Sequence, residues 1–340
     1  MLLAPVAWLP WYLAHAVWLI LTVLSFGLAV ASLASLLGLD WKERRTYLFL
    51  ALALALAPFH TGMAAGSIVI VVVALCAFAT LAANRAWKVA AGVVLAVAVG
   101  LKPQIGLPFL AFYVLRKRWR LATISLAVLV ILSAVAIFFL KLNHAPWLEN
   151  YKYDNRVLFA HGSLGDFTEA NPIRFSLVNL QVLLYTFTAN RTTANVMAFV
   201  IALVLGALWL VLFLQDRGHG DDELVQLSAL TVLSLLPVYH RLYDASLLIF
   251  PLAWSVANLS TSRNRITKLI FFLILAFLVP GGSVLEVMQR TGHFIALQHS
   301  WFWSRFVMPH QVWVLVALSC LLLSAMRHSA LHAARSATED

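Results

Sequence analysis

The composition of this 340-residue chain excludes a soluble protein. Hydrophobic residues make up 62% of it and charged residues only 11%, whereas soluble domains contain about 45–50% and about 25% of these classes. A soluble fold of this size could not bury so much apolar surface. The formal net charge of +10 would suggest nucleic acid in a polar chain, but in a membrane protein Lys and Arg mark cytoplasmic helix ends. We therefore expect an integral membrane protein that binds membrane lipids and no nucleic acid.

Cysteine-based sites and common cofactor motifs are not indicated. Cys76 and Cys320 both lie inside apolar runs, where neither a disulfide framework nor a thiolate metal site is expected. The sequence contains no Walker loop, no metal-binding His pair and no dinucleotide-binding Gly pattern. We expect neither a metal ion nor an organic cofactor.

Apolar segments separated by Pro/Gly breaks or charged loops follow one another along the chain. Their limits are Ala14–Leu37, Thr46–Pro58, Gly66–Ala83, Trp87–Leu101, Gln104–Leu115, Leu121–Leu140, Thr192–Leu214, Leu224–Pro237, Ala245–Ala257, Leu269–Val279 and Val312–Met326. Each is expected to be helical, because unpaired backbone groups are too costly in hydrocarbon. The fold class predicted is an all-α polytopic integral membrane protein, one membrane domain over residues 1–340 with about eleven transmembrane or re-entrant helices.

Positive charge sets the predicted orientation. If successive loops alternate between the two sides, one set of loops holds most of the Lys and Arg residues and is therefore cytoplasmic. This set comprises Asp40–Arg45, Asn84–Lys88, Arg116–Arg120, Gln215–Glu223, Arg263–Lys268 and the tail from Arg327. The N-terminus then lies outside, and no basic residue precedes Lys42. We therefore expect a chain that is shortened at its N-terminus by at least one helix.

Several segments are too short to cross a core of about 30 Å at about 1.5 Å per residue. Three polar breaks beside such short segments fall on the outer side: Phe59–Met63, Leu101–Gln104 and Pro237–Asp244. Non-helical backbone at membrane depth must line protein or water. The sequence therefore predicts a cavity that opens to the outer side.

Cationic side chains at two of these breaks suit an anionic ligand. Pro103 forces Lys102 out of helical geometry and fits the first turn of the next helix, so an ammonium stands beside a helix N-terminus. His240 and Arg241 offer a second cationic group, and the guanidinium fork matches phosphate. The alternatives are that Lys102 snorkels to the headgroups, that Arg241 and Asp244 only neutralise each other, and that His60 is simply packed.

A long outer segment, residues 141–191, contains many aromatic and acidic side chains. We expect an extracytoplasmic loop followed by an amphipathic or re-entrant helix over Ile173–Thr188. This segment suits a lid that covers the cavity and contacts a polar acceptor molecule. It equally suits an interfacial belt, because Trp and Tyr are enriched at that depth.

Three stretches resemble the polytopic family-87 glycosyltransferases, which include polyprenol-phosphate-mannose-dependent α-1,2-mannosyltransferases. They are Gly100-Leu101-Lys102-Pro103-Gln104 with the basic turn Arg116–Arg120, the run Leu235–Asp244, and Ala4-Pro5 through Trp18. The resemblance implies a GT-C-like fold in the bacterial plasma membrane. It also implies transfer of a hexose, mannose, from a polyprenyl-phosphate-linked donor to a glycolipid or glycan acceptor on the extracytoplasmic side.

The resemblance also assigns site residues. Those expected to bind the donor phosphate or substrate are Lys102, Gln104, His240, Arg241, Tyr243 and His60. The catalytic Asp of the family is expected in a first outer loop that this sequence lacks, and His60-Thr61-Gly62 stands where members carry Gly-Gln. Among the carboxylates on the predicted outer side, Asp154 and Asp244 are the candidate substitutes. A lipid-linked-substrate transporter or flippase, or a catalytically inactive remnant, is the alternative.

Overall fold

The computed structural model describes residues 6, 8–215, 223–259, 265–298 and 300–339. Within these residues the chain is helical, and apart from one isolated antiparallel bridge between Leu177 and Arg241 it contains no β-structure. Five helical segments are long and apolar enough to cross a membrane, and the bent pair α3–α4 supplies a sixth if it is counted as one span. The chain is thus an all-α membrane protein, as the composition predicts, while the number of about eleven helices in the membrane stays a prediction.

The chain divides into two compact units, residues 1–54 with 59–153 and residues 55–58 with 154–340. We refer to them as unit 1 and unit 2 and describe each by itself. The single membrane domain over residues 1–340 remains a prediction.

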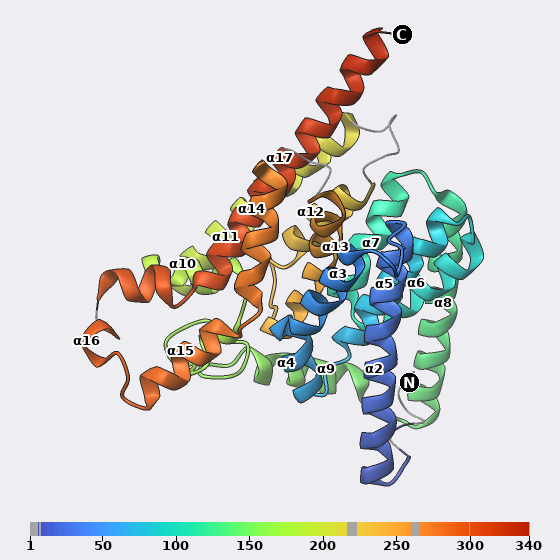
Figure 1. Ribbon diagram of the computed structural model, residues 1–340. Helices are drawn as coiled ribbons and strands as arrows, with labels where there is room; N and C mark the ends of the chain where they lie inside the picture. The colour runs from blue at the N-terminus through green and yellow to red at the C-terminus, as the bar shows by residue number, and fades with distance from the viewer. Residues whose placement is uncertain (1–5, 7, 216–222, 260–264, 299, 340) are drawn as a thin grey trace. The chain divides into compact units, whose positions relative to one another are not determined.

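Unit 1 is built around α5 and α6. Its elements are α2 (Trp11–Leu36), α3 (Arg44–Ala55), α4 (Ala57–Ala64), α5 (Val69–Asn84), α6 (Lys88–Leu101), α7 (Pro103–Leu115), α8 (Trp119–Leu142) and the first part of α9 (Trp147–Leu158). α5 packs against α2 and α6, and α6 also packs against α7 and α8 (Figure 1). α5 is buried over most of its Val- and Ala-rich length, whereas only 6% of the most apolar stretch of α8 is buried. α8 therefore offers its apolar surface to lipid.

Unit 2 is built around the long C-terminal helix. Its elements are η1 (Arg174–Ser176), α10 (Leu180–Thr188), α11 (Arg191–Gln215), α12 (Glu223–Ser234), η3 (Leu242–Leu248), α13 (Ile249–Asn258), α14 (Arg265–Ile274), η4 (Leu275–Phe277), α15 (Gly281–Arg290), α16 (Ile295–Gln298), the π-helical turn η5 (Trp303–Val307) and α17 (His310–Glu339). α17, drawn in red, packs against α11, α12 and α14 (Figure 1). Its buried leucines, among them Leu315, Leu318 and Leu322, form much of the core of unit 2.

The first predicted break is misplaced. Phe59–Met63 is helical, as part of α4, and the interruption falls at Leu56, where α3 and α4 meet at a bend of 43°. Pro58 explains the position. It has no N–H to donate to the carbonyl of Leu54 four residues earlier, so the helix breaks just before it. The Nε2 atom of His60 lies 2.6 Å from that carbonyl oxygen and takes the missing place.

The predicted helix Ile173–Thr188 is also wrong in its extent. The chain forms the short 3-10 helix η1, then an extended stretch, and α10 begins only at Leu180. The side chain of Asn179 accepts a hydrogen bond from the backbone N–H of Val182 at 3.4 Å and so caps α10. Parts of three stretches used for the prediction lie outside the described residues. They are residues 216–222, residues 263–264, and Ala4-Pro5 near the N-terminus.

Candidate active site

The break at Lys102 in unit 1 has the predicted geometry. Lys102 is the one residue between α6 and α7, with extended backbone angles of φ −149° and ψ 89°, and Pro103 is the first residue of α7. The carbonyl of Lys102 accepts hydrogen bonds from Ile105 and Gly106 at 3.0 and 3.1 Å. The lysine thus stands at a helix N-terminus, where the backbone dipoles add to its positive charge.

Two other predicted residues lie near helix starts in the same part of the chain. Gln104 is half-buried in the first turn of α7. His60 lies in α4 and lines an apolar cavity of about 120 Å³ together with Phe26, Phe59 and Met63. Since Nε2 of His60 is engaged with the carbonyl of Leu54, only Nδ1 of its ring is left for a ligand.

The third predicted break, Pro237–Asp244, lies in unit 2 and is held in place by a distant segment. The backbone N–H of Val178 donates to the carbonyl of His240 at 3.0 Å, and Leu180 donates to Leu236 at 3.0 Å. The Gln181 side chain donates to the carbonyl of Pro237 at 2.7 Å. Val178 and the first two residues of α10 therefore supply the hydrogen bonds that the non-helical backbone between α12 and η3 requires. The predicted break extends too far, because its last residues, Leu242 to Asp244, belong to η3.

A buried His–Asp pair stands at the end of this break. Nδ1 of His240 lies 3.1 Å from Oδ2 of Asp244, and both side chains are at most 1% exposed. The same carboxylate oxygen accepts the backbone N–H of Arg241 at 3.0 Å. Among the described residues, Nε2 of His240 has no hydrogen-bond partner although it is buried. A buried polar nitrogen without a partner costs about 1–3 kcal/mol, so this atom is the natural contact for a polar group of a ligand.

Arg241 and two tyrosines complete the cluster. A guanidinium N–H of Arg241 donates to Oγ of Ser176 at 3.3 Å. Burial raises the pKa of Tyr239 to about 12, against the opposing effect of Arg241. Burial and the charge of Asp244 likewise raise the pKa of Tyr243. Both phenols therefore keep their protons at neutral pH and can donate hydrogen bonds.

The candidate carboxylates differ in what surrounds them. Asp154 lies exposed on α9, whereas Asp244 is engaged with His240 and Arg241. Asp166 has a structural role. It is fully buried and accepts hydrogen bonds from the backbone of Gly162 and from the backbone and hydroxyl of Thr168, at 2.8 to 3.0 Å. Burial raises its pKa, but these hydrogen bonds and Arg191 outweigh burial, so the pKa lies below its usual value.

One polar cavity in unit 2 was not anticipated. It has a volume of about 190 Å³ and is lined by Glu169, Asn171, Pro172, Arg174, Phe175, Glu286, Gln289 and Arg290. The Glu286 carboxylate accepts the backbone N–H of Phe175 at 2.9 Å. Guanidinium and carboxylate groups around one small space can bind a hydroxyl-rich group through paired hydrogen bonds. The acidic and basic residues were visible in the sequence, but no local pattern joins segment 169–175 to segment 286–290.

The structure thus brings His240, Arg241, Tyr243 and Asp244 together in unit 2. Lys102, Gln104 and His60 belong to unit 1, and Asp154 lies on α9 at the start of unit 2. No group of three or more His, Cys, Asp or Glu side chains that could hold a metal ion occurs in the described part of the chain.

The long apolar helices and the breaks between them define a polytopic membrane protein. Lys102, His240 and Arg241 lie at these breaks. The sequence model of Glycosyltransferase family 87 matches residues 1–251. The chain belongs to this family and is a membrane glycosyltransferase. The match includes Lys102 and the whole Pro237–Asp244 break. Comparisons with curated proteins and with solved structures give no match.

Proposed function

We propose that this glycosyltransferase transfers a hexose, mannose, from a polyprenyl-phosphate-linked donor to a hydroxyl of a glycolipid or glycan. We further propose that transfer takes place on the extracytoplasmic side of a bacterial plasma membrane. The observation that carries the proposal is the Lys102 break, where a cation and a helix N-terminus interrupt two apolar helices. A lipid-borne donor places its phosphate beside apolar segments, and such a break supplies the charge that the phosphate needs.

The His240 cluster supports a second set of phosphate contacts. With Nδ1 of His240 held by the Asp244 carboxylate, Nε2 is the ring nitrogen that remains for a ligand. Arg241 offers a planar fork to phosphate oxygens, and Tyr243 adds a phenol that stays protonated at neutral pH. The proposal has two separate parts: Lys102 with Gln104 in unit 1, and the His240 cluster in unit 2. Each part is tested by its own variant.

The proposed reaction breaks the bond between the anomeric carbon of the donor sugar and the phosphate oxygen. The polyprenyl phosphate leaves with the bonding electrons, and positive groups stabilise its growing charge. The acceptor oxygen forms the new bond to the anomeric carbon, and its proton passes to a base. Asp154 is the exposed candidate for that base. Asp244 already accepts two hydrogen bonds, so we propose that it positions His240.

Donor binding by the full chain in detergent tests the phosphate contacts. Lys102→Met and His240→Gln should each weaken binding of a polyprenyl-phosphate hexose by about tenfold or more, because hydrogen bonds to charged groups contribute about 1.5–3 kcal/mol. Lys42→Met, which removes an exposed lysine from the turn before α3, is the matched control and should bind as the wild type does. Unchanged donor affinity in both site variants would contradict the phosphate assignment.

A further inference from the structure

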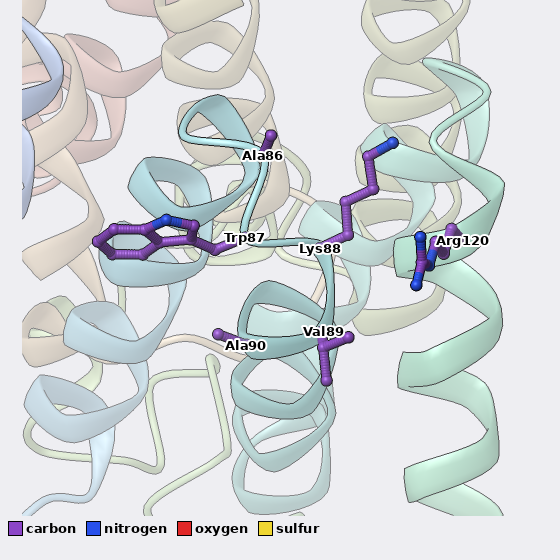
Figure 2. A pocket seen from close by; sticks show the side chains of 6 residues that line it. All are labelled: Ala86, Trp87, Lys88, Val89, Ala90 and Arg120. Carbon is purple, nitrogen blue, oxygen red and sulfur yellow. The ribbon is translucent and has the colours of Figure 1, made fainter.

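A basic cavity lies in unit 1 at the opposite end of α6 from the Lys102 break. Its volume is about 400 Å³, and it is lined by Ala86, Trp87, Lys88, Val89, Ala90 and Arg120. Figure 2 shows Lys88 projecting from the start of α6 and Arg120 from the start of α8, both to the same side of Trp87. Two helix starts and two cations thus border one hollow.

In the described part of the chain, no counter-ion pairs with either cation. Both side chains are exposed, and none of the residues that line the cavity is a carboxylate. Neither Lys88 nor Arg120 belongs to an ion pair with any residue that the structure describes. The cavity therefore has a positive charge that a bound anion would neutralise.

The helix starts that carry the two cations are held together by a tight contact about one turn further along both helices. The Ser125 hydroxyl on α8 donates to the carbonyl of Gly92 on α6 at 2.8 Å, and this bond is buried. A Cβ atom at Gly92 would lie 2.8 Å from Cγ2 of Ile124, so only glycine permits this approach of the helices. The backbones that carry Lys88 and Arg120 are thereby held together.

The backbone adds to the positive potential. The N-cap residues of α6 and α8 are Trp87 and Arg118, and neither makes a side-chain capping hydrogen bond. The N–H of Lys88 already donates to the carbonyl of Ala86 at 2.9 Å. The first turn of α6 and Arg120 in the first turn of α8 line the cavity, so the positive ends of both helix dipoles lie beside it.

Aromatic side chains indicate the depth of the cavity in the membrane. Trp87 is 49% exposed and Trp119, next to Arg120, is 56% exposed. The guanidinium of Arg85 lies 5.4 Å from the ring centroid of Trp87. Exposed tryptophan beside Lys and Arg is typical of the headgroup region, where basic pockets between transmembrane helices bind anionic headgroups.

We propose that this cavity binds the phosphate headgroup of an anionic membrane phospholipid, between Lys88 and Arg120. The site is separate from the donor contacts proposed above and does not depend on them. It would hold the α6 and α8 ends at the headgroup level of the leaflet, because the lipid phosphate bridges both cations while its acyl chains lie along the exposed apolar face of α8.

Native mass spectrometry of the full chain, titrated with phosphatidylglycerol, phosphatidylcholine and inorganic phosphate, tests this proposal. The wild type should bind phosphatidylglycerol more tightly than phosphatidylcholine. Lys88→Ala/Arg120→Ala should bind phosphatidylglycerol about 30-fold more weakly, since each basic residue near an anionic surface contributes roughly fivefold. Lys88→Arg/Arg120→Lys keeps both charges and should bind within about threefold of the wild type.

The matched control is Lys42→Ala/Arg44→Ala, which removes two exposed charges, one in the turn before α3 and one on its first residue, and should leave phosphatidylglycerol binding intact. Three results would overturn the proposal. One is wild-type affinity in the Lys88/Arg120 double alanine variant, and another is an equal loss in the control, which would indicate net charge alone. The third is inorganic phosphate that displaces the lipid from the wild type, which would make the site one for free phosphate.

Discussion

At the scale of single residues, the fold depends on side chains that replace missing backbone partners. Pro58 leaves the carbonyl of Leu54 without its helical donor, and the His60 ring takes that place at 2.6 Å. Asn179 caps α10 in a similar way. Such side-chain hydrogen bonds matter more in a membrane protein than in a soluble one, because no water in the hydrocarbon can satisfy backbone groups that lack a helical partner.

Asp166 allows a prediction at this scale. The two carboxylate oxygens of Asp166 accept three hydrogen bonds. Asp166→Asn removes the charge and replaces one of these oxygens with an NH2 donor, so we expect a loss of about 2 kcal/mol in the free energy of unfolding at pH 7. Because the folded-state pKa of Asp166 lies below its usual value, the wild type holds this stabilisation above the unfolded pKa of about 3.9. It loses the stabilisation as the pH falls through the lower, folded-state pKa.

Thermal melts of the two proteins in detergent at a series of pH values measure this effect. The difference between wild type and Asp166→Asn should be full at pH 7 and should shrink below about pH 4. Glu149→Gln, at an exposed carboxylate on α9, serves as the control and should melt as the wild type does. A difference that stays constant down to the lowest pH would show that the charge of Asp166 does not stabilise the loop.

At the scale of elements, the α6–α7 junction is set by a close approach of the two helices. A Cβ atom at Gly106 in α7 would lie 2.6 Å from the backbone nitrogen of Val99 in α6. This contact, together with Pro103, holds Lys102 between two helices that turn back on each other. The position of the lysine therefore depends on a small residue one turn away.

Gly106→Ala should destabilise the protein by about 1–3 kcal/mol, because backbone atoms cannot move aside as a flexible side chain would. It should also weaken donor binding through displacement of Lys102. Gly100→Ala is the matched control in the same helix pair, since its new methyl group would meet only Leu129 at 3.9 Å. Melting temperatures and donor titrations of both variants measure the effect; a Gly106→Ala protein as stable as Gly100→Ala would refute the close contact.

The elements that the sequence predicted well are those with local causes. The Lys102-Pro103 break follows from the geometry of proline and its preceding residue, and it was placed correctly. The long apolar helices follow from hydropathy, and most of their observed ends lie within a few residues of the predicted ones, but α17 continues to Glu339, beyond the predicted end at Met326. The break near Pro58 lies before the predicted one. The prediction follows the polar residues of Phe59–Met63, whereas the proline itself sets the interruption.

The part that the sequence did not predict depends on pairing between distant segments. Val178 and Leu180 hydrogen-bond to the backbone of His240 and Leu236, and Glu286 accepts from Phe175. Side-chain periodicity contains no information about such partners, so it predicts one continuous helix over residues 173–188. The His240–Asp244 pair was visible as a cluster in the sequence, but its burial and hydrogen bonds were not.

At the scale of the whole molecule, the chain is a family-87 glycosyltransferase with two compact units. The family match ends at residue 251, so α14, α15 and α17 lie beyond it. Those helices include α17, which packs against α11 and α12, so residues beyond the matched range help to form the core of unit 2. The His240 break lies within the match and the C-terminal core of unit 2 extends beyond it.

The most direct test of the central proposal is the choice of sugar donor. The full chain, reconstituted in liposomes with a glycolipid acceptor, is supplied with radiolabelled mannose on either a polyprenyl phosphate or a nucleotide diphosphate. We predict that label reaches the acceptor from the polyprenyl phosphate only, and that Lys102→Met lowers this rate while Lys42→Met does not. Transfer from the nucleotide sugar, or a Lys102→Met protein as active as the wild type, would contradict a lipid-phosphate donor held at this break.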